Sequence, residues 1–118
     1  MKLPMTVMRL DEEDNPSLAI IDLHDCDFIE NEGRRIVYHI RDEKYYHIGT
    51  KSEMEMLLEK EGFEILDRPY LVNMKHIDRF DEKFCKVFFK STTNKSVTVA
   101  RGSVKLVKEY LAREKNKG

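Results

Sequence analysis

The chain has 118 residues, of which 41% are hydrophobic and 36% are charged, a composition typical of one globular domain with a heavily charged surface. Its apolar runs are too short to span a membrane, and residues 1–4 do not begin a signal peptide. We therefore expect a cytoplasmic protein with no membrane partner. Its two cysteines, Cys26 and Cys85, are expected to be free thiols in that compartment.

The formal net charge is only -1, but the charges are segregated along the chain. Residues 83–118 contain ten Lys/Arg and two Asp/Glu, whereas residues 1–82 contain eleven Lys/Arg and twenty Asp/Glu. A distribution of this kind can present a basic face on an otherwise acidic protein. The alternative is a basic C-terminal helix and tail that only favour solubility.

Alternating apolar residues and turn signals predict a chain rich in short strands. An apolar segment at 4–10 and an acidic turn at 11–16 come first. The expected strands are residues 18–21, 27–30, 34–41, 45–48, 63–66, 77–80, 84–90 and 96–100. Asn31 and Gly33 indicate a hairpin turn, and residues 91–95 a polar turn. Residues 67–73 fit neither the strand period nor the helix period.

Two helices are expected among these strands. Residues 50–61 can begin with a capping box and end before Gly62. A last helix follows Ser103, which can cap it, and carries an apolar stripe that includes Val107 and Leu111. Many strands with two helices predict an α+β domain that is predominantly β.

Residues 62–73 read Gly-Phe-Glu-Ile-Leu-Asp-Arg-Pro-Tyr-Leu-Val-Asn and are followed by Ile77. This string resembles the signature of LytTR DNA-binding domains, Phe-x-x-x-His-Arg-Ser-Tyr-Leu-Val-Asn, found in LytR/AgrA/AlgR-type regulators. Segments 27–30, 46–58 and 97–101 resemble further motifs of that family in the same order. In this sequence Asp67 and Pro69 replace the family's His and Ser, and Ala100 replaces a Ser.

The resemblance implies a LytTR-like arrangement of short, mostly antiparallel strands with two short helices. It places an N-terminal arm at 1–17, the DNA-binding domain at 18–113 and a basic tail at 114–118. It also implies a bacterial-type transcription regulator, similar to response-regulator output domains, that binds double-stranded DNA. Family sites are commonly direct repeats bound by two protomers, which implies a weak or DNA-assisted homodimer.

The family is understood to read successive major grooves with loops on a β scaffold, and arginine suits this because its planar fork bonds both guanine and phosphate. Three arginines match family contact positions and are expected to read bases: Arg34, Arg68 and Arg101. The residues expected near phosphates are Arg35, Lys51, Lys95, Ser103 and Lys105. Asn73 is expected to be structural, bonding nearby backbone.

The same residues also allow other interpretations. The arginines can be ordinary solvated side chains, and Arg68 can pair with Asp67 or Glu64. The acidic first part of the chain supports a different function, a protein-interaction module that keeps the LytTR fold without binding DNA. Neither the four histidines nor the cysteines show catalytic or metal-ligand spacing, so we expect no enzyme activity, cofactor or metal.

Overall fold

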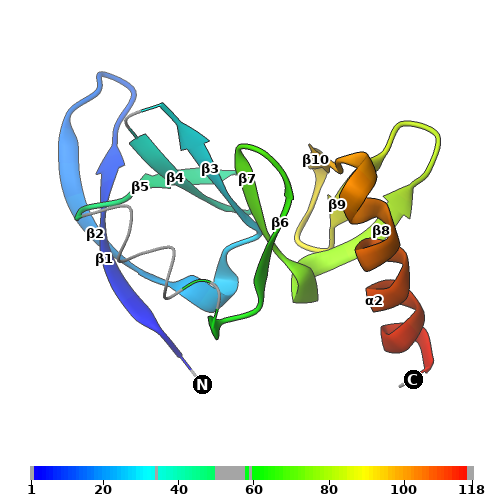
Figure 1. Cartoon of the computed structure of the whole chain (residues 1–118). Coiled ribbons are helices and arrows are strands. Elements are labelled where there is room, and N and C mark those ends of the chain that lie inside the picture. The colour runs from blue at the N-terminus through cyan, green and yellow to red at the C-terminus, as the bar shows by residue number, and fades with distance from the viewer. Residues whose placement is uncertain (1, 34, 50–57, 59, 117–118) are drawn as a thin grey trace.

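A computed structural model of the chain describes residues 2–33, 35–49, 58 and 60–116. Within these residues the chain forms ten strands, three short 3-10 helices and the helix α2 (Figure 1). The strands are β1 (Pro4–Leu10), β2 (Pro16–Asp22), β3 (Phe28–Glu32), β4 (Arg35–Ile40), β5 (Glu43–Tyr46), β6 (Phe63–Asp67), β7 (Tyr70–Asn73), β8 (Ile77–Asp81), β9 (Lys86–Phe89) and β10 (Thr92–Thr98). The helices are η1 (Leu23–Asp25), η2 (Met74–His76), η3 (Arg101–Ser103) and α2 (Val104–Asn116).

The strands form two antiparallel sheets. The larger has the order β2-β1-β5-β4-β3-β7-β6, and the smaller has the order β10-β9-β8. Figure 1 shows the smaller sheet beside the β6–β7 hairpin, and α2 runs along the smaller sheet. The prediction of a predominantly β domain with mostly antiparallel strands is therefore confirmed.

Each face of the larger sheet has its own core, because successive residues of a strand point to opposite faces. Phe28 belongs to the core between the two sheets and α2, where its ring stacks on Phe89 of the smaller sheet with centroids 5.4 Å apart. Its neighbour Ile29 belongs to the second core on the other face, together with Leu58. The larger sheet is thus covered by apolar side chains on both sides around β3.

Most expected elements are present, with three informative differences. Residues 4–10, expected within an N-terminal arm, form β1 and pair with both β2 and β5. Residues 67–73 contribute to a hairpin, β6–β7, whose turn contains the cis peptide bond Arg68-Pro69. Residues 91–95 were expected to be a turn, but β10 begins at Thr92 and its pairing with β9 shifts register before Ser96.

The last helix is confirmed as α2, which buries Val107 completely. The helix expected at 50–61 lies almost entirely outside the described residues, although Leu58 and Lys60 are helical. Gly62 has a φ of 87°, a left-handed conformation in which glycine is favoured.

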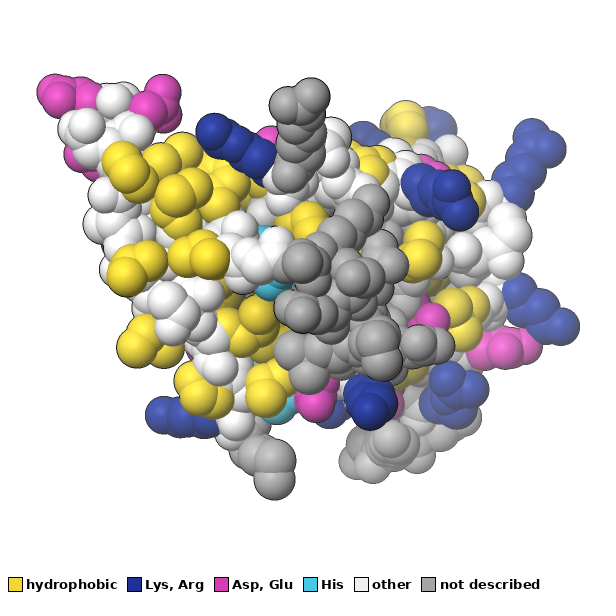
Figure 2. Space-filling model, turned by 60° about the vertical axis from the view of Figure 1, so that its left-hand side comes forward, with side chains coloured by type: hydrophobic (Ala, Val, Ile, Leu, Met, Phe, Trp, Pro, Cys, Tyr) yellow, Lys and Arg dark blue, Asp and Glu magenta, His cyan; other side chains and the backbone are white. Residues whose placement is uncertain are grey.

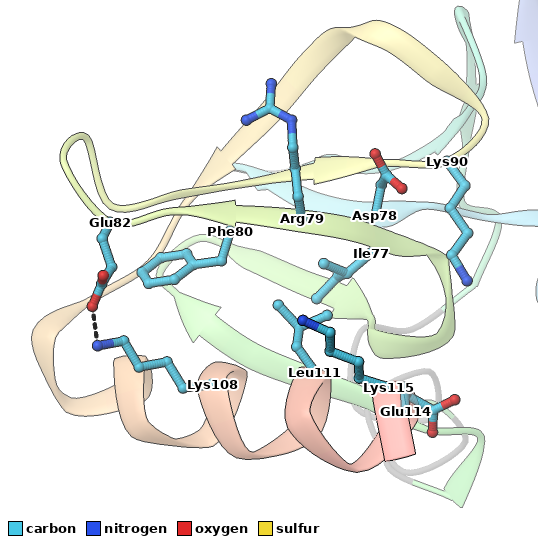
Figure 3. A pocket seen from close by; sticks show the side chains of 10 residues that line it. All are labelled: Ile77, Asp78, Arg79, Phe80, Glu82, Lys90, Lys108, Leu111, Glu114 and Lys115. Carbon is cyan, nitrogen blue, oxygen red and sulfur yellow. Dashed lines mark ion pairs between the residues drawn. The ribbon is translucent and has the colours of Figure 1, made fainter. Parts of the chain in front are cut away.

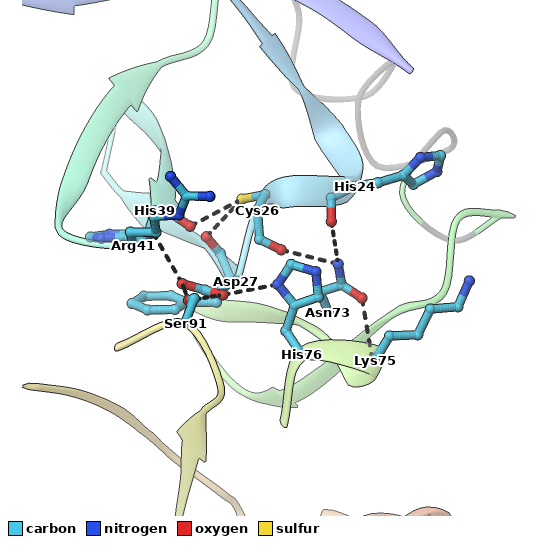
Figure 4. A network of polar contacts seen from close by, with 10 residues as sticks. His24, Cys26, Asp27, His39, Arg41, Asn73, Lys75, His76 and Ser91 are labelled. Atoms are coloured by element: carbon cyan, nitrogen blue, oxygen red, sulfur yellow. Dashed lines mark hydrogen bonds and ion pairs between the residues drawn. The ribbon is translucent and has the colours of Figure 1, made fainter. Parts of the chain in front are cut away.

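A buried carboxylate joins the two sheets (Figure 4). Asp27, which is 0% exposed, accepts hydrogen bonds from the Ser91 hydroxyl at 2.7 and 2.8 Å and lies 2.9 Å from His76 Nδ1. It also accepts the backbone N–H of Arg41 at 3.2 Å. Because these partners come from segments far apart in the sequence, Asp27 fixes β3 against the start of the smaller sheet.

Asn73 adds a second polar tie next to Asp27. Its amide group donates to the carbonyl of Cys26 at 3.0 Å, and its side-chain oxygen accepts the N–H of Lys75 at 3.3 Å. Its backbone N–H donates to the carbonyl of Asp27 at 2.9 Å. The structural role predicted for Asn73 is confirmed.

We expect Asp27→Ala to lower the free energy of unfolding by about 3–5 kcal/mol, because it removes a buried acceptor and leaves its donors without partners. Urea unfolding followed by circular dichroism measures this change. Asp25→Ala is the matched control, because Asp25 lies two residues away and is exposed. Equal stability of the two variants would contradict the role assigned to Asp27.

Candidate nucleic-acid interface

Three turns that carry predicted arginines are neighbours in the fold. Arg35 begins β4 directly after the β3–β4 turn, Arg68 lies in the β6–β7 turn, and Arg101 begins η3 after β10. In Figure 1 these three places lie along the upper side of the molecule. We call the surface formed by Arg35, Arg68 and Arg101 the arginine edge.

Backbone hydrogen bonds hold the three turns together. The N–H of Asn31, just before the β3–β4 turn, donates to the carbonyl of Pro69 at 3.0 Å. The N–H of Ala100, just before Arg101, donates to the carbonyl of Leu66 at 2.7 Å. The arginine edge therefore rests on a hydrogen-bonded frame that uses both sheets.

The side chains of the arginine edge project into solvent. Arg35, Arg68 and Arg101 are all exposed, and no ion pair to any of them is found among the described residues. The guanidinium of Arg35 lies over the Tyr46 ring, 5.2 Å from its centroid. Arg68 does not pair with Asp67 or Glu64 within this part of the chain. The three cations are thus available to an anionic partner.

Asp67, the residue that replaces a family histidine, has a partner within the fold. Its carboxylate accepts a hydrogen bond from the Thr98 hydroxyl at 2.6 Å, which links β6 to β10. The Ser103 hydroxyl donates to the carbonyl of Ile65 on the same strand at 3.5 Å, a long bond. Both bonds thus connect β6 to residues next to the arginine edge, Asp67 to β10 and Ser103 to Ile65.

The other predicted contact residues differ in position. Lys105 is exposed on the first turn of α2, two residues after Ser103, and its Nζ lies 3.9 Å from Glu109. Lys95 is half-buried, and its Nζ lies 3.3 Å from Nδ1 of His39 at the opposite end of β4 from Arg35. Arg34 and Lys51 lie outside the described residues. The structure thus groups Arg35, Arg68, Arg101, Ser103 and Lys105, and places Lys95 elsewhere.

Lys95 takes part in a buried cluster around His39. The imidazole stacks on Phe28 with centroids 4.2 Å apart, and its Nε2 lies 2.9 Å from a carboxylate oxygen of Glu30. Because the lysine ammonium can only donate, Nδ1 accepts from Lys95 and the ring proton lies on Nε2, which donates to Glu30. Burial lowers the pKa of Lys95 below its usual value.

Burial also lowers the pKa of His39 to about 4, and the cations of Lys95 and Lys44 act in the same direction. The carboxylates of Glu32 and Asp27 favour the charged imidazolium, but burial and the two lysines outweigh them. His39 is therefore neutral at pH 7.

This depressed pKa predicts acid-sensitive stability. In the unfolded chain His39 takes up a proton near its ordinary pKa of about 6.5, whereas in the fold it stays neutral to about 4. The contribution of His39 to the free energy of unfolding is therefore fully present above pH 6.5 and is lost as the pH falls toward 4. We expect His39 to account for a loss of roughly 1–2 kcal/mol between pH 7 and pH 5.

Urea unfolding from pH 7 to pH 4, compared between wild type and His39→Gln, measures this contribution. The variant should lose less stability over that range, whatever its stability at pH 7. An NMR titration of the ring in the folded protein should show no protonation above pH 5. A His39 ring that titrates at its ordinary pKa would contradict the assignment.

A groove lies between β8 and α2 (Figure 3). It has a volume of about 550 Å³ and a floor that includes Ile77, Phe80 and Leu111. Its rim mixes acidic and basic residues, and Lys108 and Glu82 form an ion pair across it. Among the described residues no three His, Cys, Asp or Glu side chains gather as metal ligands.

The family model of the LytTr DNA-binding domain matches residues 17–112. The chain belongs to the LytTR family. This family is a DNA-binding domain family, so the assignment of a DNA-binding, transcription-regulator type of domain is established at that level, and the resemblance found in the sequence is confirmed.

A solved structure agrees with this assignment. The LytTr DNA-binding domain of a methyl-accepting/DNA response regulator from Bacillus cereus matches with a TM-score of 0.63 and 16% sequence identity. The match covers 90% of this chain and 95% of the other, and at this identity it shows the shared LytTR fold alone. No curated protein matches the chain. None of the described helices of this LytTR domain has the length and apolar character needed to cross a membrane.

Two contributions to the site were not predicted from the sequence. Tyr46 supports Arg35 from the neighbouring strand β5, and Asp27 stabilises the junction that holds the turns. Asp27 stood out only as part of a family-like motif, because its side-chain partners His76 and Ser91 lie 49 and 64 residues away in the sequence. No local pattern reports such a contact.

Proposed function

We propose that this LytTR domain binds duplex DNA sequence-specifically as a cytoplasmic transcriptional regulator and that the arginine edge is its reading surface. The observation that carries the proposal is the juxtaposition of Arg35, Arg68 and Arg101, all exposed, on one hydrogen-bonded frame. A rigid frame is what base recognition needs, because paired bonds to a guanine edge require a fixed direction of approach.

Each cation of the edge has an assigned role in this proposal. Arg68 and Arg101, together with Arg34 beside Arg35, read base edges in the major groove. Arg35, Ser103 and Lys105 contact phosphates, which position the protein without reading sequence. Lys51 is proposed as a further phosphate contact. Lys95 is not included, because its ammonium group contacts His39 in the half-buried cluster.

An alternative function is a protein-interaction module with the LytTR fold. Asp67, an acid at a position where family members have a histidine, would favour this alternative if its carboxylate were free. The contact between Asp67 and Thr98 gives that carboxylate a role within the fold, so the DNA-binding function is the better supported of the two. The charge segregation of the chain also favours DNA, since η3 and α2 belong to the basic part.

We expect an Arg34/Arg68/Arg101 triple-alanine variant to lose sequence-selective binding to duplex DNA. Each lost base contact should cost about 1–3 kcal/mol of discrimination between sequences. Fluorescence anisotropy with random-sequence and genomic duplex pools, at low and physiological salt, measures binding and selectivity. A triple-alanine variant at Lys60, Lys75 and Arg113 is the matched control, because it removes the same charge from exposed positions outside the arginine edge.

Equal losses in the two triple variants would contradict an arginine edge that reads sequence, and would indicate attraction by overall charge alone. A folded, monodisperse wild-type protein that binds no duplex at low salt would contradict the DNA-binding function. That result would favour the protein-interaction module.

Lys105→Ala should weaken binding about equally for all sequences, because a phosphate contact carries no base information. It should also reduce the slope of log K against log salt by about 0.9, the effect of one lost phosphate contact. Anisotropy titrations over a salt series measure both quantities. Lys60→Ala is the control. A change in sequence preference in Lys105→Ala would contradict its assigned role.

A further inference from the structure

The strand β2 has features of a protein contact that the arginine edge does not use. It is the end strand of the larger sheet, and its outer backbone edge pairs with no other strand of the described chain. Leu18 and Ile20 are 75% and 76% exposed. Figure 2 shows hydrophobic side chains gathered on the side of the molecule formed by the β1–β2 hairpin, below its acidic turn. Natural proteins commonly protect such edges with charges, bulges or internal prolines.

Those protections are absent from the middle of β2. Residues 17–21 contain no charged residue and no proline, and β2 pairs with β1 in a continuous register with no bulge. Alternation places Leu18 and Ile20 on one face, whereas Ala19 and Ile21 point to the second core. The free edge therefore offers regular hydrogen-bonding groups with two large apolar side chains beside them.

We propose that β2 pairs antiparallel with β2 of a second copy of this chain, forming a two-fold symmetric dimer through a continuous sheet. With Ala19 on the two-fold axis, Leu18 of each copy lies opposite Ile20 of the other. The four exposed apolar side chains then cover one another on one face. A strand that is complementary to itself in this way fits the isologous contact that a two-fold dimer requires.

The charges at the two ends of β2 favour the antiparallel arrangement. The turn before β2 carries Asp11, Glu12, Glu13 and Asp14. The other end of the strand has both signs of charge, with Lys2 as well as Asp22 and Asp25, and His24 there already contacts Glu61. Antiparallel pairing keeps the two acidic turns at opposite ends of the paired strands. A parallel arrangement would bring two acidic turns together and would be opposed by their repulsion.

Sedimentation equilibrium without DNA, from micromolar to millimolar protein, tests the dimer and does not depend on the proposed DNA-binding function. We expect a concentration-dependent dimer, and we expect Ile20→Lys to raise its Kd by at least about tenfold, because each copy then buries a charge beside Leu18 of the other. Phe84→Lys is the matched control, because Phe84 is an exposed apolar residue in the β8–β9 turn.

A cysteine cross-link tests the register. Directly opposed residues of antiparallel strands have Cα atoms about 4.5–5.5 Å apart, which suits a disulfide. In a Cys85→Ser background, Ala19→Cys should therefore form a dimer under mild oxidation with diamide. Ser17→Cys should not, because the two copies of residue 17 lie about 13 Å apart along the paired strands.

A protein that stays monomeric at millimolar concentration, or an Ile20→Lys dimer as strong as wild type, would overturn the proposal. Equal cross-linking of the two cysteine variants would overturn the register.

Discussion

The hydrogen bonds of Asp27 connect elements that the backbone alone leaves separate. The two sheets share no strand, and the larger sheet packs against the smaller through apolar side chains such as Phe28 and Phe89. Apolar packing is strong but weakly directional, whereas a buried carboxylate with several donors allows few arrangements. Asp27 therefore determines how the sheets are oriented relative to each other. The relative positions of the turns that extend from both sheets depend on that orientation.

The same dependence explains why the arginine edge has a defined shape. Two of its turns belong to hairpins of the larger sheet, and the third follows β10 of the smaller sheet. The bonds from Asn31 to Pro69 and from Ala100 to Leu66 join these turns directly. Asp67, which departs from the family signature, contributes to this frame through its hydrogen bond with Thr98. The carboxylate of Asp67 thus has a structural role on the same edge that exposes the arginine side chains.

Local patterns in the sequence predicted the parts of the fold that depend on neighbouring residues. The turn at Gly33 and the apolar stripe of α2 are examples, because turn geometry and helical period are both encoded within a few positions. The β6–β7 hairpin was not predicted, because proline usually argues against a strand and Pro69 lies in its two-residue turn. The contact between Lys95 and His39 was also not predicted, since the two residues are 56 positions apart. The candidate site was predicted mainly from the resemblance to a family. That its arginines lie close together could be seen only in the folded structure.

The arrangement of the edge on separate short turns has an evolutionary consequence. Arg35 and Arg101 follow different strands, and neither side chain belongs to the two cores. Substitutions at such positions leave burial and backbone pairing intact, so they cost little stability. The exposed arginines of the edge can therefore diverge one turn at a time while Asp27 and the cores stay unchanged. A scaffold of this kind allows related proteins to acquire different binding specificities by single substitutions, each of which leaves the fold stable.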